Sequence, residues 1–111
     1  MIFNKETVDV TIVSANFNKG EYIYEYFESI LNSSVLPNEI IFIDDASTDN
    51  SLYKIGKYKH LKFLKIISLN QNHGFAEALN IGLETARSEY IMRLDPDDFI
   101  TKYRIKEQFH F

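Results

Sequence analysis

Three carboxylates within four residues, Asp95, Asp97 and Asp98, could do the most specific chemistry in this sequence. Like charges this close repel one another, and each carboxylate resists the loss of its hydration water. Mg²⁺ or Mn²⁺ would relieve both effects, since these ions take one or two protein carboxylates and fill their shells with phosphate and water. An ordinary turn that caps the next helix is the alternative, because Asp and Pro96 both favour turns. The cluster predicts a metal site that holds a phosphorylated ligand.

A second acidic pair, Asp44 and Asp45, directly follows the apolar run at residues 39–43. Such a run is typical of a strand buried on both faces of a parallel sheet. Ligands of open α/β sheets bind outside the carboxyl ends of the strands, although a simple turn would also explain this pair. Acids that end two different strands are expected at one rim of the sheet, with Asn16 and Phe17 from the end of the first strand.

The elements that must position these residues alternate along the chain. Strands are predicted from β-branched and apolar runs at residues 8–15, 39–43, 61–69 and 90–94. Helices are predicted from apolar residues at helical spacing in residues 22–31, 52–58, 75–86 and from 101 onward. This order predicts a single α/β domain with a parallel sheet and right-handed crossovers.

Local signals refine the predicted helices. Asn18 followed by Glu21 has the pattern of a capping box for the first helix, and Ser47 is a candidate cap for the second. Gly82 lowers the helix propensity of the third helix, so it is expected where that helix packs closely on the sheet.

Composition excludes several classes of protein. The formal net charge of -4 argues against a nucleic-acid backbone binder, and the absence of cysteine excludes disulfides and thiolate chemistry. No apolar run approaches the roughly 20 residues of a membrane helix. Residues 1–6 lack the pattern of a signal peptide, so a cytoplasmic location is expected. No glycine lies between Ser14 and Lys19, which removes the main support for a dinucleotide-binding loop.

Other polar side chains give weaker signals. The three histidines do not have metal-ligand spacing, and His73, on the expected rim, is most simply a solvated loop residue. The arginines, Arg93 among them, show no pattern that distinguishes them from surface charge. Phe17 could stack on a base or pack in the core.

The order and spacing of these pieces resemble the nucleotide-sugar-binding half of the family 2 glycosyltransferases, which have the GT-A fold. The resemblance rests on four motifs, at residues 10–18, 39–49, 72–82 and 88–98. It implies a Rossmann-like parallel sheet flanked by helices, with residues 1–111 as a partial GT-A domain truncated after the DxD motif. The apolar end at residues 109–111 suggests an unfinished chain that could self-associate through its C-terminal edge.

The resemblance also implies a donor site for a UDP-sugar. Ala15 and Phe17 would flank the base, with Phe17 in the stacking position. Asp45 would hydrogen-bond the base and Asp44 would support it. Two further elements, Asn80 and the Gly74 loop, would line the donor pocket.

The acidic cluster would be the DxD motif of the family. Asp97 would bind Mn²⁺ or Mg²⁺, Asp95 would contact the ribose or metal-bound water, and Asp98 would assist. The implied reaction is an inverting transfer of the sugar to an acceptor hydroxyl, in which the metal stabilises the departing diphosphate. The family's catalytic base lies beyond the DxD motif, so no base is identified here. We expect weak donor binding, if any, and no turnover by this chain alone.

The partners implied are a nucleotide-sugar and a glycan, lipid-linked or protein acceptor, in polysaccharide biosynthesis at the cell envelope. A peripheral position at the inner face of the membrane would fit such acceptors, and no nucleic acid is involved. The chain departs from the family in the first loop, where proline and tyrosine are common, and at Leu79, where many members have arginine.

Two other classes compete with this interpretation. A sugar-phosphate nucleotidyltransferase also places acids at a sheet edge, but it should have a glycine-rich basic loop after its first strand. A non-catalytic α/β interaction or regulatory module is the third hypothesis. A receiver-type phosphoacceptor would have its acidic pair after the first strand, where this chain has Ser14, Ala15 and Asn16.

Overall fold

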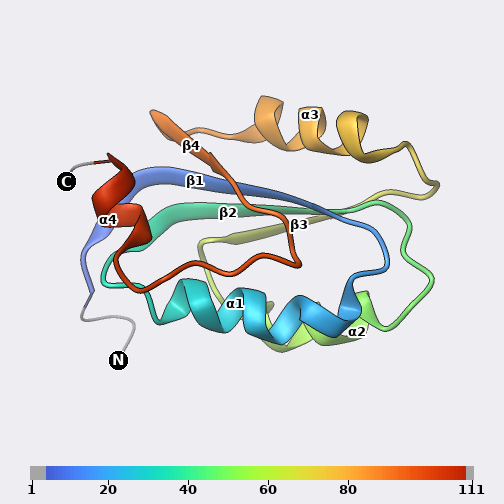
Figure 1. Cartoon of the computed structure of the whole chain (residues 1–111). Helices are drawn as coiled ribbons and strands as arrows, with labels where there is room; N and C mark the ends of the chain where they lie inside the picture. The colour runs from blue at the N-terminus through green and yellow to red at the C-terminus, as the bar shows by residue number, and fades with distance from the viewer. Residues whose placement is uncertain (1–4, 110–111) are drawn as a thin grey trace.

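Four parallel strands form the centre of the computed structural model, which describes residues 5–109 (Figure 1). The strands are β1 (Thr7–Asn16), β2 (Leu36–Asp44), β3 (Leu64–Ser68) and β4 (Tyr90–Arg93). Their spatial order is β3-β2-β1-β4, and each neighbouring pair is parallel. The predicted parallel sheet is confirmed, and the carboxyl ends of its strands share one edge. The expectations for residues 1–4 and for the chain end at 110–111 lie outside the described residues.

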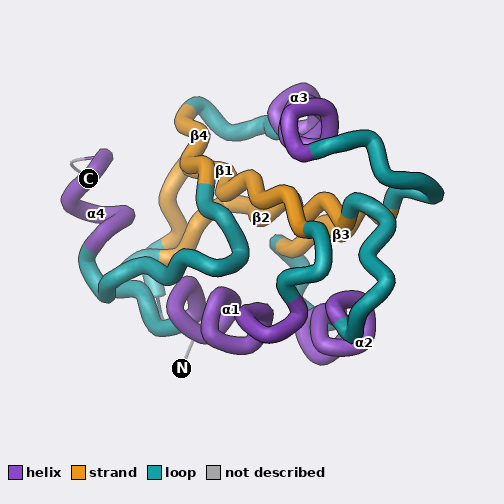
Figure 2. The backbone as a smooth tube through the Cα atoms, turned by 45° about the vertical axis from the view of Figure 1, so that its right-hand side comes forward, coloured by secondary structure: helices purple, strands orange, loops and turns teal. Residues whose placement is uncertain are grey.

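Helices cover both faces of the sheet, as Figures 1 and 2 show. One face carries α3 (Phe75–Thr85), and the other carries α1 (Ile23–Leu31) and α2 (Ser51–Ile55). Two 3-10 turns, η2 (Gly20–Tyr22) and η3 (Gly56–Tyr58), precede α1 and follow α2, and α4 (Arg104–Phe109) ends the described chain. Within residues 5–109, no helix has the length and apolar character needed to cross a bilayer.

The larger core lies between the sheet and α1. The predicted apolar stripe of this helix is confirmed, because Tyr26, Phe27 and two isoleucines are fully buried. The Phe27 ring stacks on Tyr58 with centroids 4.3 Å apart, and Tyr26 meets Phe42 edge-on at 5.5 Å. The Tyr26 hydroxyl shares a buried hydrogen bond with Ser14, and burial raises the pKa of this tyrosine. The aromatic layer fixes α1 beneath β1 and β2.

The smaller core lies between the sheet and α3, where small residues allow close approach. A Cβ added to Gly82 would stand 2.5 Å from Cγ1 of Val13. The predicted close packing at Gly82 is therefore confirmed. It brings the first turn of α3 down to the carboxyl ends of β1 and β2.

We expect Gly82→Ala to destabilise the fold although alanine is the better helix former. Overpacking costs about 1–3 kcal/mol, whereas the gain in helix propensity is about 1 kcal/mol. The contact cannot be relieved easily because Val13 is β-branched and stiff at χ1. Urea unfolding should give a net loss of up to about 2 kcal/mol in the free energy of unfolding.

Gly56→Ala is the matched control for this prediction. Gly56 has helical φ and ψ, and an added Cβ would meet nothing within 4 Å. This substitution should stabilise the protein by about 0.5–1 kcal/mol. Equal effects at the two glycines would contradict the close packing of α3.

Three local predictions differ from the structure. Neither η2 nor α1 has a side-chain cap, so the capping box predicted at Asn18 is wrong. The cap predicted for the second helix at Ser47 is also wrong, because Asn50 is the residue that precedes α2. Both polar side chains instead bond across the rim. The third strand begins at Leu64 rather than at Leu61, because two successive turns bend the chain there, with Leu61 N bonded to Tyr58 O and Leu64 N to Leu61 O.

Candidate active site

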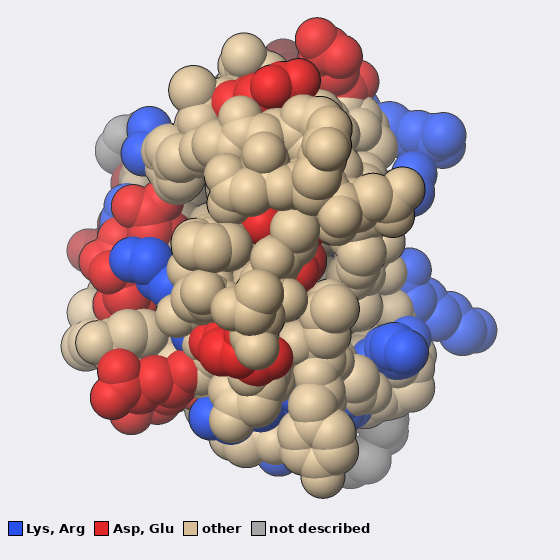
Figure 3. Space-filling view, turned by 90° about the vertical axis from the view of Figure 1, so that its right-hand side faces the viewer, with Lys and Arg blue, Asp and Glu red and all other residues tan. Residues whose placement is uncertain are grey.

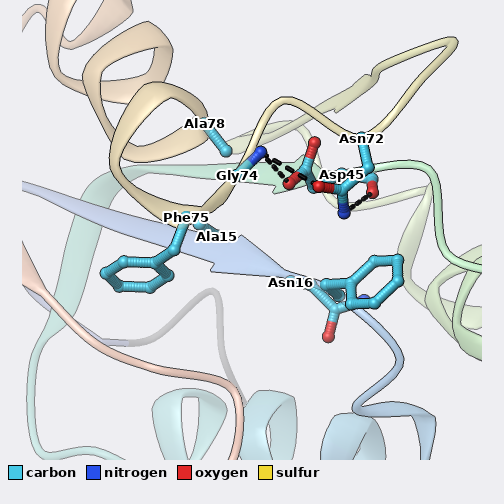
Figure 4. Close-up of a pocket in the computed structure, with 8 residues that line it drawn as sticks. Ala15, Asn16, Asp45, Asn72, Gly74, Phe75 and Ala78 are labelled. Carbon is cyan, nitrogen blue, oxygen red and sulfur yellow. Dashed lines mark hydrogen bonds between the residues drawn. The ribbon is translucent and has the colours of Figure 1, made fainter.

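A pocket of about 260 Å³ opens at the carboxyl edge of the sheet, beside the start of α3 (Figure 4). Its walls combine two aromatic rings with a carboxylate, two amides and small residues. The lining residues are Ala15, Asn16, Phe17, Asp45, Asn72, Gly74, Phe75 and Ala78. A flat, partly polar ring is the kind of ligand that such walls suit.

The carboxylate of Asp45 holds one side of this pocket together. Its Oδ1 accepts a hydrogen bond from the backbone N–H of His73 at 2.8 Å, and its Oδ2 accepts one from Gly74 at 3.0 Å. Asn72 Nδ2 also donates to the backbone oxygen of Asp45 at 3.2 Å (Figure 4). Gly74 has φ 89° and ψ 157°, a conformation that residues with a side chain rarely adopt. The loop before α3 is thus docked on the end of β2.

The neighbouring carboxylate, Asp44, is 1% exposed and points into the protein. It accepts hydrogen bonds from Asn16 Nδ2 at 2.9 Å and from the Ser47 hydroxyl at 2.8 Å. The Oδ1 of Asn16 is buried and has no hydrogen-bond donor among the described residues. An unpaired buried acceptor at the wall of a pocket is a feature that a ligand donor could satisfy.

Further bonds tie the loop after β1 to the loop after β2. The Asn18 side-chain oxygen accepts from the backbone N–H of Thr48 at 2.8 Å and of Asp49 at 3.2 Å. In return, the backbone N–H of Gly20 donates to Asp49 Oδ2 at 2.9 Å. Burial opposes ionisation of Asp49, but hydrogen bonds from Ser51 and Gly20 outweigh it and lower the pKa of this carboxyl. The two loops therefore form one connected rim.

The acidic cluster lies on the loop after β4. Carboxylate oxygens of Asp95, Asp97 and Asp98 all lie within 4.8 Å of one another, with Asp95 partly buried and the others exposed. Asp98 N also bonds to Asp95 O at 2.9 Å, so the segment forms a turn as well as a cluster. Three hard oxygen donors at this spacing fit Mg²⁺ or Mn²⁺. In Figure 3, which faces the strand ends, acidic groups lie at the centre as well as at the upper and left margins, and most basic groups lie at the margins.

Two basic side chains contact the acidic cluster, and one of them, Arg93, connects it to the pocket. Lys19 Nζ lies 2.7 Å from Asp97 Oδ2, and this bond raises the pKa of the lysine and lowers that of the aspartate. Arg93 Nε lies 3.7 Å from Asp95 Oδ1, and the same guanidinium stands 4.7 Å from the ring centre of Phe75 in the pocket wall. The pocket and the acidic cluster are therefore neighbours on one rim.

The structure brings most of the residues predicted for the site together. Four of the predicted donor residues line the pocket, namely Ala15, Phe17, Asp45 and Gly74. The predicted metal residues form one cluster, as described above. Asp44 stands behind the pocket wall, and Asn80 is exposed on α3 and is not among the residues that line the pocket.

Sequence reasoning did not assign a role to several residues of the site. Arg93 was expected to be ordinary surface charge, but it packs on Phe75 beside the acidic cluster. Its position directly after an apolar run and two residues before Asp95 was the available signal. Lys19 carried no signal, because its partner is 78 residues away in the chain.

A parallel sheet with a pocket and an acidic cluster on one rim is the arrangement of an α/β domain that binds its ligand outside the carboxyl ends of the strands. Residues 11–111 match the family described as Glycosyl transferase family 2, and the chain belongs to this family. It is 38% identical over 103 residues to an uncharacterized glycosyltransferase of Haemophilus influenzae, covering 92% of this chain and 41% of that protein. It is also 38% identical over 104 residues to the Escherichia coli UDP-Glc:alpha-D-GlcNAc-diphosphoundecaprenol beta-1,3-glucosyltransferase WfaP. This match covers 92% of this chain and 40% of WfaP.

Solved structures show the same fold. Staphylococcus aureus TarS 1-349 in complex with UDP-GlcNAc superimposes with a TM-score of 0.84 and 28% identity, over 93% of this chain and 30% of that one. The Pyrobaculum calidifontis mannosyltransferase PcManGT, in complex with GDP-Man and Mn²⁺, superimposes with a TM-score of 0.72 and 26% identity. The match covers 80% of this chain and 27% of that one. The GT-A fold predicted from the sequence is confirmed. The chain spans less than half the length of these relatives.

Proposed function

We propose that this chain is the donor-binding part of an inverting, metal-dependent glycosyltransferase that uses a UDP-sugar. The observation that carries the proposal is the adjacency of the pocket to the acidic cluster, bridged by Arg93 between Phe75 and Asp95. A nucleoside diphosphate has the same two parts, a flat base and a charged diphosphate. The complexes of the S. aureus neighbour with UDP and UDP-GlcNAc support this choice of ligand.

In this proposal the base enters the pocket between Ala15 and Phe17. Asp45 already accepts two backbone hydrogen bonds, but each carboxylate oxygen has a second lone pair that can accept from the base. Asp44 supports the site by orienting Asn16. The Gly74 loop forms the wall opposite β1. Asn80 lies outside the pocket lining, so in this proposal it contacts a part of the donor other than the base.

The residues Asp95, Asp97 and Asp98 would hold Mn²⁺ or Mg²⁺. When bound, the metal would supply Lewis-acid stabilisation of the departing diphosphate. The Mn²⁺ complex of the P. calidifontis neighbour supports a divalent ion in this kind of site. The chain's own residues keep the carboxylates oriented, through the turn at Asp95 and Asp98 and through Arg93 beside Asp95.

We further propose that residues 1–111 are part of a larger GT-A domain and do not turn over alone. The chain spans 41% of the H. influenzae relative, and we assign no catalytic base within it. The acceptor would be a glycan, a lipid-linked sugar or a protein, in polysaccharide biosynthesis at the cell envelope. A cytoplasmic location at the inner face of the membrane and self-association through the C-terminal edge stay predictions.

Calorimetric titration with UDP and with GDP, each with and without Mn²⁺, tests this proposal. UDP should bind only weakly, with a Kd on the order of 1 mM or about −4 kcal/mol, and more tightly with Mn²⁺ than without it. GDP should bind less well, because its larger base must enter the same pocket. If no nucleotide bound under any metal condition, the chain would not be an autonomous donor-binding module.

A further inference from the structure

A lysine of the chain itself already lies at the acidic cluster. Lys19 Nζ donates a hydrogen bond to Asp97 Oδ2 at 2.7 Å. The side chains are 40% and 39% exposed, so the pair is open to solvent and to ions. The positive charge of the Lys19 ammonium partly offsets the negative charge of the cluster, as a metal ion would.

The backbone on both sides of Lys19 is held in place. Asn18 is bonded to the loop after β2, and the backbone N–H of Gly20 is bonded to Asp49. The backbone of Lys19 is therefore held in place, whereas its ammonium can change position because the four-carbon side chain of lysine is flexible. Lys19 follows Phe17, a residue of the pocket wall, by two positions, and its ammonium reaches the acidic cluster.

We propose that Lys19 is a tethered cation that competes with the metal for Asp97 and thereby couples metal binding to nucleotide binding. The inference rests on the proposed function of the cluster. A divalent ion bound at Asp97 would stand close to the Lys19 ammonium at Oδ2, and two cations at one carboxylate repel each other. Metal binding therefore favours departure of the ammonium.

The coupling follows from where the released ammonium can go. Without nucleotide, the ammonium loses the Asp97 carboxylate as its partner and gains only water. With nucleotide, a diphosphate that joined the base pocket to the metal would lie near Asp97, within reach of the flexible Lys19 side chain, and it would offer the ammonium a new anionic partner. Metal alone should therefore bind less tightly than metal with nucleotide, and by linkage the metal should strengthen nucleotide binding by the same factor.

The test is the affinity for Mn²⁺, measured from the electron paramagnetic resonance of free Mn²⁺, with and without saturating UDP. Lys19→Met should bind Mn²⁺ alone about three- to tenfold more tightly than the native chain, a modest factor because exposed ion pairs are weak. The strengthening produced by UDP should shrink correspondingly. Lys19→Arg keeps a cation at Asp97 and should behave nearly as the native chain does.

Lys65→Met is the matched control, because Lys65 is an exposed lysine near the amino end of β3 and its loss changes the net charge equally. It should leave both affinities unchanged. Mn²⁺ binding that Asp97→Asn removes but Lys19→Met does not alter would overturn the role of Lys19 and leave the proposed function intact. Mn²⁺ binding that is insensitive to Asp97→Asn, or absent altogether, would overturn both.

Discussion

Replacing Asp97 with asparagine is expected to abolish the Mn²⁺-dependent part of UDP affinity. The amide keeps the shape of the side chain but removes its charge, and a hard divalent cation depends on charged oxygen ligands. Affinity for UDP in the presence of Mn²⁺ should fall by about tenfold or more, which corresponds to about 1.4 kcal/mol. Affinity measured without metal should change little. Titration calorimetry of both proteins, with and without Mn²⁺, measures the difference.

Asp9→Asn provides the matched control for the Asp97 prediction. Asp9 is an exposed aspartate near the amino end of β1, so its replacement changes the net charge equally at the opposite edge of the sheet. This variant should bind UDP and Mn²⁺ as the native chain does. If Asp97→Asn kept its full response to Mn²⁺, the metal would have to bind elsewhere.

Asp45→Ala should lose both stability and nucleotide binding. Asp45 is 2% exposed, and its removal leaves the backbone N–H groups of His73 and Gly74 without their acceptor. The expected loss in the free energy of unfolding is about 2–3 kcal/mol, because charged hydrogen bonds are strong and buried unpaired donors are unfavourable. UDP affinity should fall by about tenfold or more, since the pocket wall and a base acceptor are lost together.

Urea unfolding and UDP titration separate the two effects of this substitution. Glu77→Ala is the control, because the Glu77 side chain is 60% exposed on the first turn of α3 and should change stability by no more than about 0.5 kcal/mol. If Asp45→Ala were destabilised but bound UDP normally at a temperature where it stays folded, the pocket would not be the base site.

Periodicity and strand order predicted most of the fold. The apolar run before Asp44 and the β-branched run before Asn16 are typical of strands in a parallel sheet, and the carboxyl ends of such strands share one rim. Gly82 was correctly expected at a close contact, because only packing explains a glycine inside an otherwise regular helix. These features depend on local sequence and on the geometry of parallel sheets.

The errors and omissions arise from long-range contacts. Asn18 has a good capping pattern, but its side-chain oxygen accepts from the loop after β2 instead, because the backbone N–H donors of that loop compete with those of the local helix. Lys19 and Arg93 are long charged side chains whose partners are set by the assembled rim. The residues next to Lys19 do not identify Asp97 as its partner, and those next to Arg93 do not identify Phe75, although Asp95 lies only two residues from Arg93. Asp45 lies on the rim where it was expected, but its hydrogen bonds to the loop before α3 depend on the tertiary fold.

The bonds between the loops after β1 and β2 have a consequence for the entropy of ligand binding. Asn18, Gly20 and Asp49 hold these loops together without any ligand. Conformational freedom of the backbone is lost at about 1–2 kcal/mol per residue, and here that loss is incurred during folding. A ligand that enters the pocket therefore finds one wall already ordered, and its arrival mainly restricts exposed side chains such as Phe17 and Lys19. Conformational freedom at this rim therefore remains mainly in its exposed side chains, while the backbone beneath them is ordered by folding.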